Sequence, residues 1–362
     1  MVIILGVIGF GGPAVHIAMM QEEVVKKRAW MSEQHFLDLV GATNLIPGPN
    51  STEMTMHIGH ERAGWKGLIV AGCCFIVPAV LITAVFAWLY SKYGQVPKVQ
   101  PYIYGIKPAI IAVVVALMIG LRRKALKNIE LGIIGLLAAV AVLAGMNEIY
   151  VLFGGGLSGV AIHLIKSTCK KINSFFPFVL LQVSDPYIHL SYLKLFWTFL
   201  KIGSILYGSG YVLFGFLDAE LVSKGLLTKQ QLTDAIAIGQ FTPGPVFSSA
   251  TFIGWQLGGA SGAIAATIGI FVPSFLFVAL LNPLISRLRK SKVMSVFLDT
   301  VNIVSVAIIL SVIIEIGRVT LLDWRTIVIA VISFVVTFSF KKINTAFIIL
   351  GGAALGFCLS LV

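Results

Sequence analysis

Long apolar stretches, separated by short polar segments, recur along the whole chain. They cover residues 67–90, 102–121, 129–145, 149–165, 192–216, 258–285, 296–316, 324–340 and 345–362. Most are close to the roughly twenty residues that an α-helix needs to cross the core of a bilayer. One more apolar stretch, residues 2–20, is interrupted by Phe10-Gly11-Gly12-Pro13. The pattern therefore predicts an all-α integral membrane protein.

Two Pro-Gly-Pro tripeptides, Pro47-Gly48-Pro49 and Pro243-Gly244-Pro245, interrupt the helical pattern. A proline removes a backbone donor and restricts the residue before it, so neither tripeptide continues a helix. Broken backbone at membrane depth is tolerated only where protein or a water-filled cavity satisfies its polar groups. A helix that restarts at a proline leaves unpaired N–H groups in its first turn, which favour an anion. We therefore expect two broken or re-entrant elements that form a transport site.

The two halves of the chain repeat the same order of glycines and prolines. Aligning Pro47 with Pro243 also places Gly12 on Gly208. After a slip of one residue, further matches follow: Gly59, Gly64, Gly67 and Pro78 fall on Gly254, Gly259, Gly262 and Pro273. Several matches in one register indicate an internal duplication. We assign residues 1–165 to an N-terminal repeat, 166–189 to a linker and 190–362 to a C-terminal repeat.

Composition supports a membrane protein, and the charge pattern predicts its orientation. Of 362 residues, 58% are hydrophobic and 12% are charged, whereas soluble proteins carry roughly a quarter charged residues. The net charge of +12 comes from short loops, which indicates the positive-inside rule and not a nucleic-acid partner. The more basic loops lie at residues 26–28, 62–66, 122–127, 166–171, 287–292 and 341–342.

These loops fall on one side if both Pro-Gly-Pro elements enter the membrane and return. The chain then has five full spans per repeat and ten in all, with the basic loops in the cytoplasm and both termini outside. An odd number of spans per repeat gives the two repeats inverted topologies, as in many secondary transporters. We expect the protein in the cell inner (plasma) membrane, with the lipid bilayer as its surroundings.

At the level of motifs the chain resembles the chromate ion transporter family. The resemblance rests on residues 10–18 (FGGPAVHIA), 47–50 (PGPN), 207–211 (YGSGY), 239–246 (GQFTPGPV), 251–254 (TFIG) and 269–274 (GIFVPS). It covers both halves and implies a secondary transporter that exports chromate, confers chromate resistance and exchanges or competes with sulfate. Two positions depart from the family pattern. The second-half Phe-Gly-Gly-Gly is Tyr207-Gly208-Ser209-Gly210 here, and Leu5 replaces a lysine whose counterpart Lys201 is kept in the second half.

The candidate substrate-binding residues surround the predicted breaks. A buried dianion must exchange its hydration shell for several hydrogen-bond donors. The candidates are Gly11, Gly12, Pro47, Gly48, Pro49, Asn50, Ser51, Lys201, Gly208, Gly210, Thr242, Pro243, Gly244, Pro245 and Ser248. Lys201 lies inside an apolar stretch and either attracts the anion or extends its ammonium group to the surface. The plainer alternative for the breaks is that glycines allow close helix packing and prolines only kink helices.

Four titratable residues are candidates for proton coupling or gating: Glu22, Glu53, His57 and Asp234. Solvated or salt-bridged roles at the membrane interface are the alternative for such groups. Glu53, His57 and His60 share a helical face, which keeps a metal site as an alternative, although a polar-face role is the expectation. We predict no metal and no cofactor. The sequence has no P-loop, so ion gradients or the membrane potential must drive transport.

Other function classes remain as alternatives. A carrier of sulfate or another oxyanion fits the same features, because sulfate and chromate are both tetrahedral dianions. A membrane-bound oxidoreductase that detoxifies chromate is less favoured, since the sequence has no haem pair, flavin fingerprint or cysteine cluster. Residues 154–159 match G-x-G-x-x-G inside an apolar stretch, where close helix packing explains them better than a dinucleotide. We therefore expect no enzyme, and a homodimer stays open.

Overall fold

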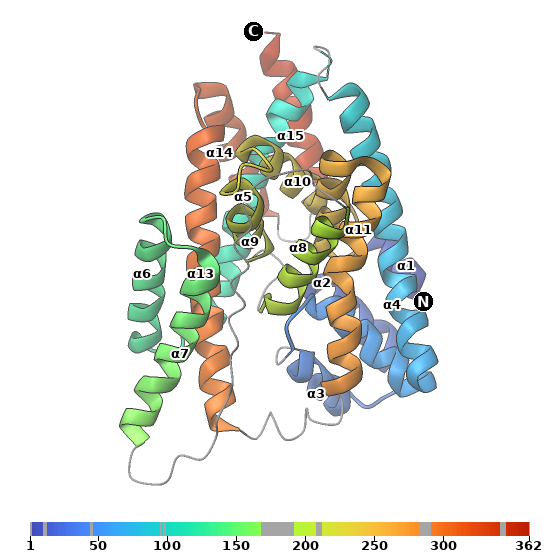
Figure 1. Ribbon diagram of the computed structural model, residues 1–362. Coiled ribbons are helices and arrows are strands. Elements are labelled where there is room, and N and C mark those ends of the chain that lie inside the picture. Colours follow the sequence, from blue (N-terminus) through green and yellow to red (C-terminus); the bar gives the residue numbers. More distant parts are fainter. Residues whose placement is uncertain are drawn as a thin grey trace.

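The computed structural model describes residues 2–9, 13–43, 46–94, 96, 99–167, 192–207, 212–281, 291–340 and 345–361. Within these residues the chain forms helices and no strands (Figure 1). The first half comprises α1 Val2–Ile8, α2 Pro13–Gln21, a π-helix Glu22–Lys27, α3 Glu33–Thr43, α4 Asn50–Tyr93, α5 Gln100–Ala125, α6 Ile129–Leu143 and α7 Glu148–Ser167. The second half comprises α8 Tyr192–Ile205, α9 Leu213–Leu217, a π-helix Asp218–Val222, α10 Lys229–Phe241, a 3-10 turn Val246–Ser248, α11 Ser249–Leu281, α13 Lys292–Thr320, α14 Trp324–Ser339 and α15 Thr345–Ser360.

The helices that lead into the two Pro-Gly-Pro turns begin in the same way. The backbone N–H of His35 donates to the Ser32 hydroxyl at 3.2 Å at the start of α3. The backbone N–H of Gln231 donates to the Thr228 hydroxyl at 3.1 Å at the start of α10. A hydroxyl at this position satisfies a backbone donor that the first helical turn leaves unpaired. The local sequence thus fixes where both helices start.

Both long helices α4 and α11 reverse direction within their length. α4 leaves helical geometry at Ala63 and Gly64, and Gly64 has a φ of 57°. A Cβ atom on Gly67 would lie only 2.0 Å from the carbonyl oxygen of Gly59. Eight residues of straight α-helix rise about 12 Å, so this approach requires the chain to fold back.

The equivalent turn in α11 lies at Gly258 and Gly259, where φ of Gly259 is 59°. A Cβ atom on Gly262 would lie 2.3 Å from the carbonyl oxygen of Gly254. In Figure 1 the turn of α4 lies low in the view and the turn of α11 lies high, and the long segments after them run in opposite directions. The inverted-repeat topology and the ten-span count stay predictions.

Several helices are suited to a bilayer. Four stretches are long and apolar enough to cross a membrane: α4, residues Glu148–Lys166 of α7, residues Val246–Leu280 and α13. Shorter apolar helices are residues Gln100–Ala116 of α5, α6, α14 and α15. On α4 the exposed side chains include Val70, Val77 and Leu81, which are 48–61% exposed. Such a broad apolar surface requires lipid around it.

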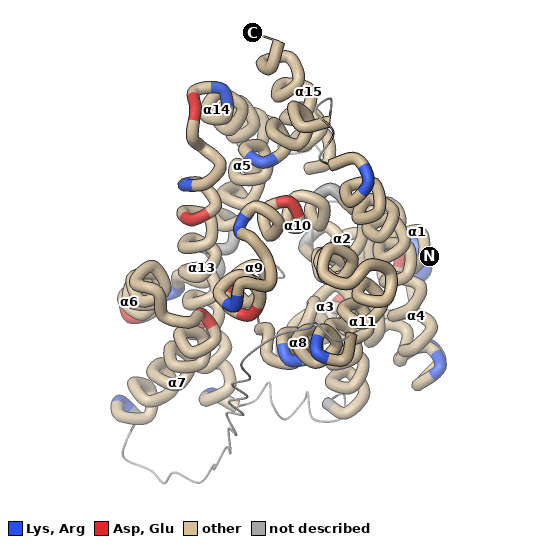
Figure 2. The backbone as a smooth tube through the Cα atoms, turned by 45° about the horizontal axis from the view of Figure 1, so that its top comes forward, with Lys and Arg blue, Asp and Glu red and all other residues tan. Residues whose placement is uncertain are grey.

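Charged residues gather mainly near helix ends, and long stretches of helix between them carry none (Figure 2). This distribution, with the apolar helices, confirms an all-α membrane protein.

Close helix packing accounts for Gly155, Gly156 and Gly159, whereas no atom lies within 4 Å of a Cβ added to Gly154. A Cβ atom on Gly156 would lie 2.6 Å from the Phe297 ring, and one on Gly159 would lie 2.0 Å from the Thr300 hydroxyl. Phe297 and Thr300 belong to α13, so α7 packs against α13 through this segment. The prediction of helix packing at this motif is confirmed.

Candidate functional site

The first Pro-Gly-Pro turn contacts the second half of the chain. Residues Pro47, Gly48 and Pro49 are buried, and Gly48 has a φ of 137°, which a residue with a side chain rarely adopts. The backbone N–H of Gly48 donates to the carbonyl oxygen of Leu206 at 2.8 Å. Leu206 directly follows α8, the first helix of the second half. This turn therefore depends on the other half for a backbone partner.

The second Pro-Gly-Pro turn makes the reciprocal contact. Gly244 has a φ of 87°, and its N–H donates to the carbonyl oxygen of Gly9 at 2.9 Å. Gly9 directly follows α1, the first helix of the first half. The same oxygen accepts from Nε2 of the buried His16 at 2.8 Å. Each turn thus docks on the end of the opposite half's first helix.

Polar side chains without partners surround the first turn. A Cβ atom on Gly48 would lie 2.3 Å from Oε1 of Glu53 and 2.5 Å from Oγ of Ser274, so both oxygens face one point. Glu53 and Ser274 are fully buried, as is Thr52. Among the described residues, none of their side-chain oxygens has a hydrogen-bond partner. Buried polar atoms rarely stay unpaired in proteins, so they mark a place for water or a ligand.

The second turn has a more apolar lining. A Cβ atom on Gly244 would lie 2.6 Å from Cβ of Ala79. Ser249 donates its hydroxyl to the carbonyl oxygen of Val246 at 2.7 Å. Within the described part of the chain, the buried Ser248 Oγ and Gln240 Nε2 lack hydrogen-bond partners. Unpaired polar groups thus occur after and before this turn.

The remaining candidates near the turns are partly or fully buried. Ser51, Thr242, Pro243 and Pro245 are buried, and Asn50 is half-buried. The other predicted glycines, Gly11, Gly12, Gly208 and Gly210, lie outside the described residues.

Lys201 is paired with an acidic residue. Its ammonium group lies 2.6 Å from Oε1 of Glu220, and Lys224 lies 2.6 Å from Oε2 of the same carboxylate. The Lys201 side chain is 47% exposed, whereas Glu220 is 6% exposed. Two lysines around one carboxylate leave one positive charge on the cluster. The structure thus places Lys201 near the surface of the chain, where it shares one carboxylate with Lys224.

The four coupling candidates occupy different surroundings. Glu22 forms an exposed ion pair with Lys26 at 3.0 Å. Glu53 and His57 are buried on α4. Asp234 is buried on α10 and lies 2.9 Å from Nζ of Lys107. Across the residues that the structure describes, no three His, Cys, Asp or Glu side chains gather in a way that holds a metal ion.

Three residues at or near the site were not among the candidates drawn from sequence. His16 and Ser274 lie in quoted motifs, but only the fold shows that they face the turns. Lys107 lies inside the apolar stretch 102–121, so the rule that selected Lys201 also points to it. Sequence thus carried a signal for Lys107.

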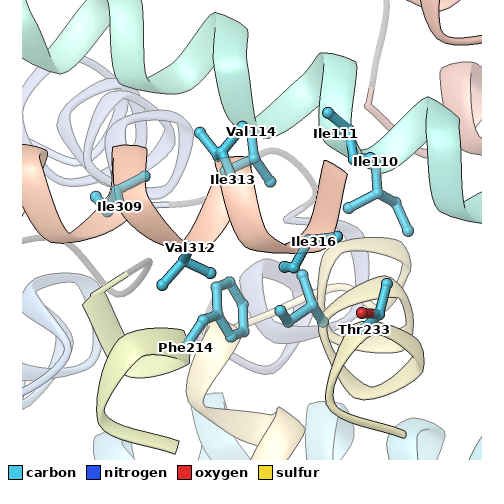
Figure 3. A pocket seen from close by; sticks show the side chains of 10 residues that line it. Ile110, Ile111, Val114, Phe214, Thr233, Ile309, Val312, Ile313 and Ile316 are labelled. Atoms are coloured by element: carbon cyan, nitrogen blue, oxygen red, sulfur yellow. The ribbon is translucent and has the colours of Figure 1, made fainter. Parts of the chain in front are cut away.

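A cavity away from the turns is lined almost entirely by apolar side chains. Figure 3 shows Ile110, Ile111 and Val114 of α5 facing residues of α13, with Thr233 as the polar contributor. A dianion needs donors that this lining does not supply. A second cavity is lined by Asp218, Lys229 and Glu315, and the two share Thr233, Val312 and Ile316. Neither cavity contains a predicted substrate-binding residue.

The apolar helices and the paired breaks in them define a multi-pass membrane protein of the transporter class. The chain belongs to the chromate transporter family, whose model matches residues 1–160 and 193–357. This membership confirms the resemblance seen in the motifs and supports transport of chromate. No solved structure matches the chain.

Proteins similar to this chain cover nearly all of it. It is 29% identical to the probable chromate transport protein of Synechococcus elongatus, over 97% of this chain and 92% of that protein. It is 27% identical to the chromate transport protein of Cupriavidus metallidurans, over 97% of this chain and 90% of that protein. It is 25% identical to the chromate transport protein of Pseudomonas aeruginosa, over 97% and 89%.

Proposed function

We propose that this chain is a secondary transporter that exports chromate across the cytoplasmic membrane. The substrate site lies between the two Pro-Gly-Pro turns. The observation that carries this proposal is the pair of buried, unpaired side chains of Glu53 and Ser274 beside Gly48. The names of the relatives favour chromate as the tetrahedral oxyanion.

The site binds a dianion through neutral donors. The starts of the helices after Pro49 and Pro245 direct backbone N–H groups and the positive end of the helix dipole toward it. The hydroxyls of Thr52, Ser248 and Ser274 replace part of the hydration shell. Sulfate has the same shape and charge as chromate, so it competes for the same donors.

Glu53 couples the anion to a proton. An ionised carboxylate repels a dianion, whereas a protonated one donates a hydrogen bond to it. Anion binding and proton binding at Glu53 therefore favour each other.

The membrane potential favours export. A dianion that leaves a cell with a negative interior gains roughly 4–5 kcal/mol per 100 mV of potential. This energy accounts for transport without a nucleotide site. The protein then acts as a carrier and not as an enzyme.

Flux measurements test the proposal. Purified protein in vesicles should move chromate, and sulfate should inhibit this flux. The pH gradient and the potential are set separately with ionophores, so the driving force of each is measured. Vesicles that show no oxyanion flux under any gradient, with folded protein present, would overturn the proposed function.

A further inference from the structure

A buried ion pair joins the two halves on the approach to the second turn. Nζ of Lys107 on α5 lies 2.9 Å from Oδ1 of Asp234 on α10. The hydroxyl of Tyr90 on α4 donates to Oδ2 of Asp234 at 2.5 Å. The side chains of Lys107 and Asp234 are 13% and 4% exposed. A cation of the first half is thus held beside an anion of the second.

Lys107 is half-buried, whereas the other lysines whose side-chain burial the structure describes are exposed. Its contact with Asp234 has the distance of an ion pair but not the geometry of a hydrogen bond, because Oδ1 has no hydrogen-bond partner among the described residues. A buried pair often adds little net stability over apolar side chains of similar size. A contribution to folding stability alone therefore accounts poorly for the buried Lys107–Asp234 pair, which points to a functional role.

The pair lies at the helix that leads into the second turn. Asp234 precedes Pro243 by nine residues, or about 13 Å along α10. Ile110 and Ile111 follow Lys107 by one helical turn and line the apolar cavity, together with Thr233 beside Asp234 (Figure 3). That cavity adjoins the polar one lined by Lys229. The two linings thus include residues near both members of the pair, although neither Lys107 nor Asp234 itself lines a cavity.

We propose that Lys107 forms a second subsite for tetrahedral dianions, and that Asp234 is its resident counter-ion. Without substrate, Asp234 neutralises Lys107, so the empty subsite carries no net charge. An arriving oxyanion displaces the Asp234 carboxylate from Lys107 and accepts a hydrogen bond from Tyr90. This subsite rests on the proposed function and extends it, because it lies apart from the Gly48 turn.

Binding measurements on the purified full chain test the subsite with three variants. Asp234→Asn removes the competing charge, so chromate and sulfate should bind roughly tenfold more tightly, while nitrate changes less. Chromate flux should fall, because the carrier releases the anion more slowly. Lys107→Gln with Asp234→Asn keeps a neutral pair of similar size and should bind dianions more weakly than the wild type, because the cation that attracts them is gone. Lys127→Gln is the matched control, since Lys127 forms an exposed ion pair with Asp299 at 2.7 Å.

The outcomes are decisive in both directions. The subsite is overturned if the double variant binds dianions as tightly as Asp234→Asn does. If Asp234→Asn does not fold, the double variant alone decides. A dianion affinity of the double variant equal to that of the wild type would show that the pair is purely structural. A wild-type protein that neither binds nor transports oxyanions overturns the proposed function instead, so the two failures are distinguishable.

Discussion

The two Pro-Gly-Pro turns have the same backbone geometry, but different side chains lie beside their glycines. Gly48 and Gly244 both have positive φ and both donate an N–H to the opposite half. Beside Gly48 lie the oxygens of Glu53 and Ser274, whereas beside Gly244 lies the methyl group of Ala79. In the register of the duplication, Ala79 and Ser274 are equivalent positions. The two turns thus share a docking geometry but differ in the side chains that face their glycines.

The helical reversals of α4 and α11 should give the largest measurable difference between the halves. A cysteine placed at each reversal either reacts with a reagent on one side of the membrane or does not. In a cysteine-free background, Ala63→Cys should react with an impermeant thiol reagent only from the cytoplasm. Ala260→Cys should react only from outside, since the inverted repeats place the two reversals on opposite sides. Both alanines are exposed next to the turning glycines. Labelling of both positions from the same side would contradict the inverted topology.

Bulky substitutions at the turns should have the next largest effect. Gly48→Leu and Gly244→Leu should each lower chromate flux in vesicles roughly 100-fold or more, because a side chain fills the site and strains a positive φ. Gly244→Leu should also lower the melting temperature more than Gly48→Leu. The methyl group of Ala79 is fixed to its helix backbone, whereas the Glu53 and Ser274 side chains rotate away.

Gly145→Leu is the control for these two variants. Gly145 has a φ of 90°, and no atom lies within 4 Å of its added Cβ. It therefore tests backbone strain without crowding at a site. A loss of flux in Gly145→Leu as large as in the turn variants would show that strain alone explains them.

Glu53→Gln separates coupling from binding at the first turn. Flux should fall roughly tenfold and lose its dependence on the pH gradient, because an amide carries no exchangeable charge. The protein should fold as well as the wild type, since the buried carboxylate has no partner in the described structure to lose. Glu130→Gln, at an exposed pair with Lys166, is the control. Unchanged pH dependence in folded Glu53→Gln would exclude Glu53 as the proton carrier.

Exchanging the Ser274 hydroxyl and the Ala79 methyl group between the two turns should have the smallest effect. Ser274→Ala should weaken chromate binding roughly fivefold, or about 1 kcal/mol, because one neutral donor is lost. Ala79→Ser should have little effect, since the second turn lacks the neighbouring carboxylate. Binding is measured by calorimetry on purified protein. Equal losses from both changes would mean that the two turns contribute alike.

Much of this fold was predictable, because apolar length and proline position act locally. The predicted stretches 129–145 and 324–340 match α6 and α14 to within two residues at each end. The reversals at Gly64 and Gly259 lie where the sequence predicts a new apolar stretch to begin, but the close packing of the helical segments on either side of each turn was not foreseen. A glycine between helical segments permits a reversal without requiring one, and the contacts that select it join residues on both sides of the turn.

The site was predictable only in part. Glu53 follows directly from its place after Pro49, but Ser274 reaches the same point from a helix far along the chain. The sequence showed Lys201 as a lone cation in an apolar stretch, yet it pairs with Glu220 nineteen residues later. That partner lies beyond a break in the helix, where periodicity no longer relates positions. Pairings across breaks and between halves depend on tertiary structure.

The reciprocal hydrogen bonds of Gly48 and Gly244 have an evolutionary consequence. Suppose that the two halves were separate chains in opposite orientations. The Gly48 and Gly244 N–H groups would then donate across an interface between two subunits. On the predicted duplication, the fused chain contains an internalised dimer interface. Once both copies lie on one chain, equivalent positions no longer have to be identical, as Ala79 and Ser274 illustrate. One half is then free to specialise in chemistry while the other keeps the scaffold.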